Sequence, residues 1–136
     1  MAEKSLTVRP GSWSEDAEVL LARSAHDPLV GVATLRGMVE AGRGVLFEVL
    51  DGAELVSAYV LQANHCEHGK EIVVVAAGAN LRGYSLTRHM VPYIEQQSMG
   101  YDRLRIAASR PGMCRQLEKM NFSRQSTTYV KNLHVF

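Results

Sequence analysis

The chain has 136 residues, of which 46% are hydrophobic and 21% are charged. This length and balance predict one compact domain over residues 1–136. The net charge of +1 gives no support for a nucleic-acid partner, and no apolar run reaches the roughly 18 residues of a membrane span. The N-terminus has no apolar stretch typical of a signal peptide. Two cysteines, Cys66 and Cys114, do not make a disulfide framework, so we expect free thiols in a cytoplasmic protein.

The first third of the chain predicts one strand and two helices. Leu6–Arg9 is a short β-prone run that stops at a Pro-Gly pair. Ser12 and Glu15 have the spacing of a capping box, which predicts that a helix begins there. Asp27-Pro28 is typical of an N-cap followed by proline at the first helical position. We therefore expect a second helix from this pair to about Gly42.

The middle of the chain predicts three strands in succession. Residues 45–50 and 55–61 are apolar runs joined by Asp51-Gly52, a strong hairpin signal. A polar turn is expected over 64–69. The run 71–77 that follows is apolar almost throughout, which favours a strand covered on both faces.

The last third predicts a β-α-β crossover, a fourth helix and one or two final strands. Apolar spacing indicates a helix around residues 86–94, and the alternation over 103–108 indicates a strand. Pro111 is placed to begin the next helix. Residues 122–136 include β-prone threonine, tyrosine and valine. The expected order is β-α-α-β-β-β-α-β-α-β, an α/β (mixed α+β) fold with one mixed sheet and helices on both faces.

The turn from the buried strand into the third helix carries the most informative motif. It consists of Asn80-Leu81-Arg82-Gly83-Tyr84-Ser85-Leu86-Thr87. This resembles the acyl-CoA motif R/Q-x-x-G-x-G/A of the GNAT N-acetyltransferases, with Arg82 first and with Ser85 and Thr87 at the later small positions. Loop amides at a helix N-terminus suit a pyrophosphate. The alternative is a plain strand-to-helix turn capped by Asn80 or Ser85.

The resemblance implies a GNAT-like central mixed sheet and an acetyl-CoA site. It assigns cofactor binding to the strand before the turn and to the turn itself, namely to Val75, Ala77, Arg82, Gly83, Tyr84, Ser85, Leu86 and Thr87. Downstream, Leu117-Glu118-Lys119-Met120-Asn121-Phe122 is similar to the family ending L-Y-E-K-x-G-F, with leucine in place of tyrosine. The resemblance is specific from about Glu71 to Phe122.

Acetyl transfer needs a neutral amine, so a base must take a proton from the acceptor. Glu71 resembles the general-base glutamate of histone-type acetyltransferases, and desolvation at the head of a buried strand is expected to raise its pKa. The alternative is a solvated glutamate that pairs with Lys70 or ends the hairpin. Leu117 cannot protonate a departing thiolate, and the sequence places neither Tyr84 nor Tyr129 beside one.

Two other clusters have simpler interpretations. His65, Cys66 and His68 lack the second ligand pair of a zinc site, so we expect a polar hairpin tip and no metal. Cys114 is expected to be a small core residue, because no histidine–aspartate pattern accompanies it. Four arginines form a basic patch that either is solvated or meets a phosphate or an acidic partner; they are Arg103, Arg105, Arg110 and Arg115.

Two functions follow from the resemblance. The first is an acetyl-CoA-dependent N-acetyltransferase that acts on a small amine or a protein acceptor. The second is a non-catalytic GNAT-fold structural or accessory protein that acts through protein partners. Arg82-Gly83 followed by Arg110-Pro111-Gly112 is also similar to small GNAT-like proteins of tailed bacteriophages, which would make the chain a virion component.

Overall fold

The computed structural model describes residues 6–23, 31–80, 86–108 and 111–133. Its centre is a five-stranded sheet in which the strands lie side by side in the order of the sequence. The strands are β1 (Leu6–Gly11), β2 (Val45–Asp51), β3 (Glu54–Cys66), β4 (Gly69–Ala79) and β5 (Arg103–Ile106). Strands β1 to β4 pair antiparallel, and β5 pairs parallel with β4. The predicted mixed sheet is therefore confirmed.

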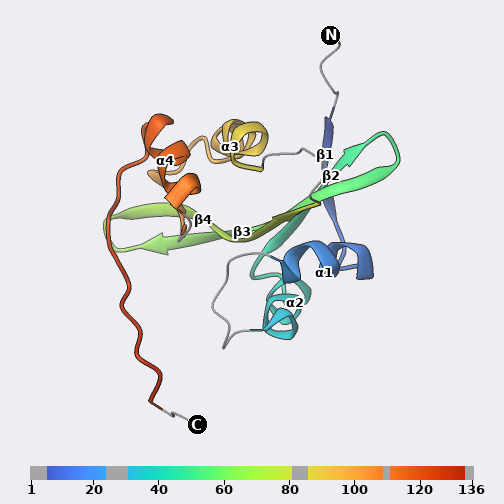
Figure 1. Ribbon diagram of the computed structural model, residues 1–136, viewed down its shortest axis with the longest axis horizontal. Coiled ribbons are helices and arrows are strands. Elements are labelled where there is room, and N and C mark those ends of the chain that lie inside the picture. The colour runs from blue at the N-terminus through green and yellow to red at the C-terminus, as the bar shows by residue number, and fades with distance from the viewer. Residues whose placement is uncertain (1–5, 24–30, 81–85, 109–110, 134–136) are drawn as a thin grey trace.

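The described residues form four helices, which cover both faces of the sheet (Figure 1). The bounds are α1 (Glu15–Ala22), α2 (Val32–Glu40), α3 (Leu86–Gln97) and α4 (Pro111–Lys119). Figure 1 shows α1 and α2 below the sheet and α3 and α4 above it. This confirms the predicted placement of helices on both faces. In the described residues no helix is long and apolar enough to cross a membrane.

Each face of the sheet has its own apolar core. On one face Leu20 and Leu21 of α1 pack with Leu35 of α2 and with sheet residues such as Val60. On the other face Met90 and Ile94 of α3 pack with sheet residues that include Val56, Tyr59 and Ile72. Burial of each large aliphatic side chain stabilises the fold by roughly 1.5–3 kcal/mol. The central strand β3 contributes to both cores, so it fixes the two helical layers relative to each other.

The two N-terminal helices begin at other residues than the sequence predicted. The Oγ of Ser14 accepts a hydrogen bond from the amide of Ala17 at 3.1 Å, so Ser14 caps α1 and the predicted Ser12 cap is wrong. Asp27-Pro28 lies outside the described residues, and α2 has Gly31 as its N-cap. The predicted end is confirmed, because Gly42 takes a left-handed φ of 77° just after the C-cap.

The β3–β4 hairpin is longer than predicted. Strand β3 runs to Cys66 and β4 starts at Gly69, so the turn consists of Glu67 and His68. The predicted turn over 64–69 was too wide because polar side chains on a solvated strand end look like a loop in sequence. The Asp51-Gly52 turn is confirmed, with Gly52 at a φ of 63°.

The predicted final strands are absent from the described residues 122–133, which form neither helix nor strand. Helix α4 ends where Asn121 adopts a φ of 71° and the amide of Phe122 donates to the carbonyl of Leu117 at 3.0 Å. The chain then runs past the β3–β4 hairpin and away from the sheet (Figure 1). Strand propensity needs a partner strand to take effect, and this segment has none among the described residues.

Candidate functional site

The pairing between strands β4 and β5 ends halfway along β4. Their parallel pairing covers four residue pairs, from Glu71 opposite Arg103 to Val74 opposite Ile106. Beyond Val74, β4 continues to Ala79 in pairing with β3 alone, within the part of the chain that the structure describes. In the described residues, the backbone of residues 75–79 therefore has no strand partner on the β5 side, and we call this stretch the open strand edge.

A β-bulge lies where the two strands part. Val60 of β3 pairs with Ala76 and the next residue, Leu61, pairs with Val74, so Val75 is an extra residue in β4. Ala76 and Val75 both pack toward the core beneath α1, whereas Ala77 packs toward the core beneath α3. A bulge bends the strand that carries it and ends regular pairing, which accounts for the divergence from β5 at this point.

The end of β4 is built from residues with little or no side chain, and α1 packs against it. A Cβ placed on Gly78 would lie 1.9 Å from the carbonyl oxygen of Leu20 in α1. Only glycine allows this approach of helix backbone to strand backbone. The hydroxyl of Ser57 in β3 donates to the carbonyl of Gly78 at 2.9 Å and fixes the strand from the other side. The open strand edge is thus rigidly supported.

The loop after this strand edge carries most of the predicted cofactor residues. Arg82, Gly83, Tyr84 and Ser85 lie outside the described residues, as do the side chains of Leu86 and Thr87. The backbone of α3 begins at Leu86. Of the predicted cofactor residues, Val75 and Ala77 are the two that the structure describes fully, and both lie on the stretch of β4 that has parted from β5.

Glu71 lies at the opposite end of the β4–β5 pairing, in an array of hydrogen-bond donors. Arg103 Nε donates to its Oε2 at 2.5 Å, and Arg105 Nε lies 3.4 Å from the same oxygen. Arg105 Nη2 donates to Oε1 at 3.0 Å, and Asn64 Nδ2 donates to that oxygen at 3.3 Å. The Glu71 side chain is only 5% exposed, while both arginine side chains are more than half exposed.

These donors lower the pKa of Glu71 to about 2, and the hydrogen bonds from Arg105 and Arg103 are the largest causes. Burial acts in the opposite direction but is outweighed. The predicted rise in the pKa is therefore wrong. An ionised carboxylate has about four lone-pair sites, and the four donor contacts occupy them.

The position of Glu71 also separates it from the open strand edge. Val75 lies four positions beyond Glu71 in β4, which corresponds to about 13 Å of strand. The Glu71 carboxylate is fully hydrogen-bonded, weakly basic and distant from the open strand edge. It is therefore placed to hold β5 against β4. Its role as general base stays a prediction, and the geometry of the site favours the structural role.

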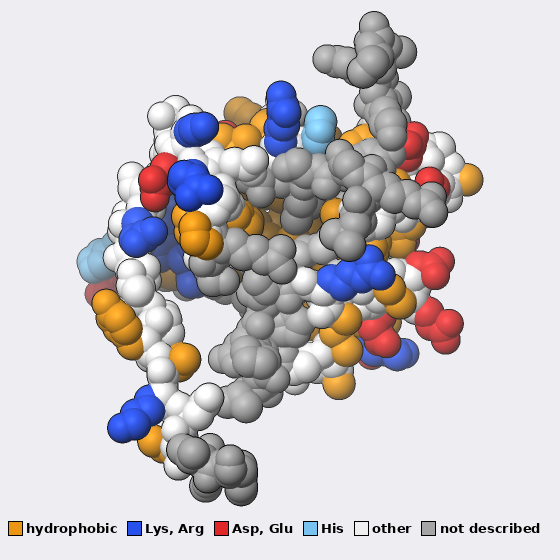
Figure 2. Space-filling model, viewed as in Figure 1, with side chains coloured by type: hydrophobic (Ala, Val, Ile, Leu, Met, Phe, Trp, Pro, Cys, Tyr) orange, Lys and Arg blue, Asp and Glu red, His pale blue; other side chains and the backbone are white. Residues whose placement is uncertain are grey.

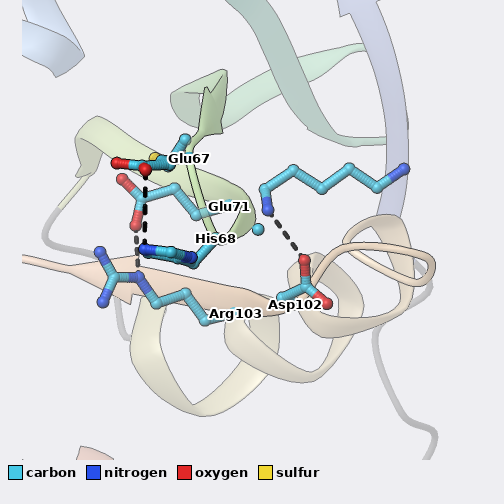
Figure 3. Close-up of a pocket in the computed structure, with 8 residues that line it drawn as sticks. Glu67, His68, Glu71, Asp102 and Arg103 are labelled. Atoms are coloured by element: carbon cyan, nitrogen blue, oxygen red, sulfur yellow. Dashed lines mark hydrogen bonds and ion pairs between the residues drawn. The ribbon is translucent and has the colours of Figure 1, made fainter.

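A shallow pocket of about 400 Å³ lies at the β3–β4 hairpin, next to Glu71 (Figure 3). Its lining comes from the hairpin and from the start of β5 and consists of Cys66, Glu67, His68, Gly69, Lys70, Glu71, Asp102 and Arg103. In Figure 3, Asp102 accepts a hydrogen bond from the backbone amide of Lys70, at 2.8 Å. The pocket is at the far end of the pairing from the open strand edge, so these are two separate features.

The sequence reasoning missed the arginines that bind Glu71. Both belonged to the predicted basic patch, and the alternation Arg103-Leu104-Arg105-Ile106 already placed them on one face of a strand. Their partner lies 32 and 34 residues earlier in the chain, and nothing local in the sequence indicates that pairing. Of the two tyrosines considered as acids, Tyr84 lies outside the described residues, and Tyr129 is 90% exposed on the C-terminal segment.

The fold is similar to that of solved acetyltransferases, although few residues are identical. No protein-family model matches the sequence, and no curated protein matches it. Glucosamine-6-phosphate N-acetyltransferase from Arabidopsis thaliana is similar with a TM-score of 0.67 at 15% identity, over 96% of this chain and 99% of that one. An acetyltransferase from Bacillus subtilis in complex with CoA gives 0.66 at 19% identity, over 90% and 79%.

A third similar structure carries the family name. It is a GNAT family acetyltransferase from Staphylococcus aureus, with a TM-score of 0.63 at 7% identity, over 95% of this chain and 99% of that one. None of these three is a phage protein, so the likeness to phage proteins gains no support. The similarity extends over 90–96% of this chain in all three cases. The chain has the fold of the GNAT acetyltransferases.

Proposed function

We propose that the chain is an N-acetyltransferase that uses acetyl-CoA and acts on an amine, either a small molecule or a residue of a protein. The observation that carries the proposal is the open edge of β4 from Val75 to Ala79, beyond the last residue pair with β5. The similar structure from Bacillus subtilis is a complex with CoA, and this supports the same ligand here.

The open strand edge fits the chemistry of the pantetheine arm of CoA. The arm is a narrow chain that contains amides, and amides can bond to exposed N–H and C=O groups of a strand. Val75 and Ala77 are the residues that we propose to hold it. The small residues Ala76 to Ala79 keep side chains from crowding the backbone. Arg82 to Thr87, the predicted acyl-CoA motif, would hold the pyrophosphate through loop amides and the guanidinium of Arg82.

When bound, acetyl-CoA supplies an activated thioester whose acyl carbon is open to attack by an amine. The chain must then orient the amine nitrogen toward that carbon at the gap between β4 and β5 and exclude water from it. A C–N bond forms as the C–S bond breaks, one proton leaves the amine nitrogen, and the sulfur gains a proton. Glu71 is proposed as a positioning residue that fixes the closed end of the gap.

Binding of the ligand is the direct test. We expect acetyl-CoA to bind at micromolar to sub-millimolar concentration in calorimetric titration, and to bind more weakly as salt is added. Arg82→Ala should weaken binding, whereas Ser85→Gly should keep or tighten it because it removes a side chain from the turn. Arg36→Ala is the matched control, since it removes an exposed charge from α2, on the other face of the sheet. No heat at millimolar ligand from the folded wild-type protein would overturn the proposal.

The role of Glu71 has its own test once activity is measured. If Glu71 is the general base, Glu71→Gln should lower turnover by a factor of order 10² to 10⁴ with CoA affinity unchanged. If it is a positioning residue, the loss of turnover should follow the loss of folded protein. Activity per folded molecule, with the folded fraction measured by circular dichroism, separates the two roles.

A second function is favoured by two features of the same region. The lone pairs of Glu71 are all engaged, and Leu117, which stands at the family's tyrosine position, is 6% exposed and packed inside the fold. Neither residue then offers acid–base chemistry. A non-catalytic GNAT-fold protein that acts through protein partners would account for both. Ligand binding without turnover of any amine would favour this alternative.

A further inference from the structure

Charge is divided unevenly along the chain. Residues 1–60 hold nine aspartates and glutamates against five lysines and arginines, whereas residues 61–136 hold five acids against ten bases. The imbalance is largest from residue 103 onward, where seven bases accompany one acid, Glu118. The net charge of +1 is therefore the sum of an acidic part and a basic part, and the field around the molecule is far from uniform.

The structure places the basic part along one side of the molecule. Figure 2 shows Lys and Arg side chains down the left, over α4 and the segment that follows it, while the Asp and Glu side chains of this view lie mainly on the right. Four exposed bases belong to α4 and this segment, and we call them the basic ridge: Arg115, Lys119, Arg124 and Lys131. The first two are four positions apart in α4 and therefore lie on the same side of the helix.

The residues of the basic ridge form no ion pairs within the described part of the chain. Arg103 and Arg105 of β5 both bind Glu71, so their charge is partly neutralised. None of the four ridge residues has such a partner among the described residues. Because like charges repel one another, a negatively charged partner would find a complementary surface here.

Exposed apolar side chains accompany the charges. Tyr129 and Val130 precede Lys131 and are 90% and 86% exposed, and Leu133 follows it at 84%. A phosphate backbone offers the aliphatic side chains of Val130 and Leu133 nothing to pack against, whereas a polypeptide offers carboxylates and apolar side chains together. Tyrosine and arginine are also enriched where proteins meet. The composition of this surface therefore favours a protein partner over a nucleic acid.

We propose that the basic ridge and the apolar side chains beside Lys131 bind an acidic segment of another protein. Carboxylates of the partner would pair with the ridge, and apolar side chains of the partner would cover Val130 and Leu133. Charge complementarity of this kind speeds the encounter and makes binding sensitive to salt. The inference goes beyond the proposed function and needs neither acetyl-CoA nor catalysis, so its failure would leave that proposal intact.

The test is fluorescence anisotropy on the full chain with three labelled probes of equal length. One is a peptide of repeated Glu-Glu-Leu triplets, the second has Gln in place of each Glu, and the third is an oligothymidylate. We expect the Glu peptide to bind at micromolar concentration and to bind more weakly as salt is added. The Gln peptide and the oligothymidylate should bind at least about tenfold more weakly.

Two variants separate the charged and the apolar parts of the surface. Arg115→Gln combined with Lys119→Gln should weaken binding of the Glu peptide by roughly two- to twentyfold and reduce its salt dependence, because each exposed ion pair contributes a factor of about 1.5 to 5. Val130→Ser should weaken binding without a change in salt dependence. Arg43→Gln is the matched control, since it removes an exposed charge just after α2 that has no ion pair with a described residue. Its affinity should equal that of wild type.

Four results would overturn the proposal. The first is a folded wild-type protein that does not bind the Glu peptide. The second is tighter binding of the oligothymidylate than of the Glu peptide, which would make the partner a nucleic acid. The third is equal affinity of wild type and the double variant of Arg115 and Lys119, which would place the binding site elsewhere. The fourth is a dimer of the protein alone, seen in sedimentation equilibrium and lost in the double variant, which would make the partner the acidic part of a second copy.

Discussion

Arg103 lies directly opposite Glu71 in the parallel pairing of β4 and β5, and its Nε donates to Oε2 of the carboxylate at 2.5 Å. Arg105, two residues further along the same strand, binds both oxygens of the same carboxylate. Strand β5 has only four residues, so this charged contact at its first residue supplements a short ladder. It holds the strands together at one end, while the bulge at Val75 separates them at the other.

Acid should weaken this contact as the pH falls toward 2. The pKa of Glu71 is about 2 in the folded chain and 4.5 in the reference state. A lowered pKa contributes stability that is complete above the unfolded value and is lost as the pH falls through the folded value. We therefore expect the stability advantage of wild type over Glu71→Gln, measured as the difference in urea midpoints, to be constant above about pH 4.5 and to shrink toward pH 2.

The matched control for the acid titration is Glu67→Gln. Glu67 lies in the adjacent turn, its side chain is 88% exposed, and its contact with His68 spans 4.0 Å. We expect the urea midpoint of this variant to equal that of wild type at every pH. If the difference in urea midpoint between wild type and Glu71→Gln stays constant down to pH 2, the ion pairs of Glu71 are contradicted.

Local signals in the sequence predicted the elements better than they predicted the site. The Asp51-Gly52 turn and the apolar run of β4 depend on neighbours along the chain, and both were predicted correctly. The state of Glu71 depends on residues 32 and 34 positions away, so reasoning from burial alone gave the wrong direction for its pKa. The bulge at Val75 depends on register with β3 and has no local signal at all.

The final strands illustrate the same limit for the fold. Thr127 to Val130 has the composition of a strand, yet a strand also requires a partner edge, and composition does not say which chain supplies it. The single chain leaves these residues exposed. The prediction from propensity therefore failed, because no described strand lies beside this segment.

Leu117 is the buried anchor of α4. It is 6% exposed, and its carbonyl accepts the amides of Met120 and Phe122 at the end of the helix. Leu117→Ala should lower the free energy of unfolding by roughly 2–5 kcal/mol, measured by urea titration. Gln116→Ala, at the neighbouring exposed position, should change it by less than about 0.5 kcal/mol. A loss below about 1 kcal/mol for Leu117→Ala would show that this side chain contributes little to the core.

Gly78 and Gly37 should respond to the same substitution with opposite sign. Alanine at Gly78 would place a Cβ 1.9 Å from the carbonyl oxygen of Leu20, so α1 must move away from β4. Because the obstacle is helix backbone and cannot rotate aside, we expect Gly78→Ala to lower the free energy of unfolding by about 1–3 kcal/mol. Gly37 lies inside α2 with no atom within 4 Å of an added Cβ. Gly37→Ala should therefore raise the free energy of unfolding by up to about 1 kcal/mol through helix propensity.

The pair of glycine variants also tests the support of the open strand edge. Displacement of α1 in Gly78→Ala removes the packing that holds residues 75–79 in place. If this edge binds acetyl-CoA, Gly78→Ala should bind the ligand more weakly than wild type under conditions in which both proteins are fully folded, whereas Gly37→Ala should bind it equally well. Calorimetric titration alongside urea unfolding measures both properties on the same samples. Equal stability of wild type and Gly78→Ala would contradict the close approach of α1 to β4, because a side chain at that position could then be accommodated without displacement of the helix.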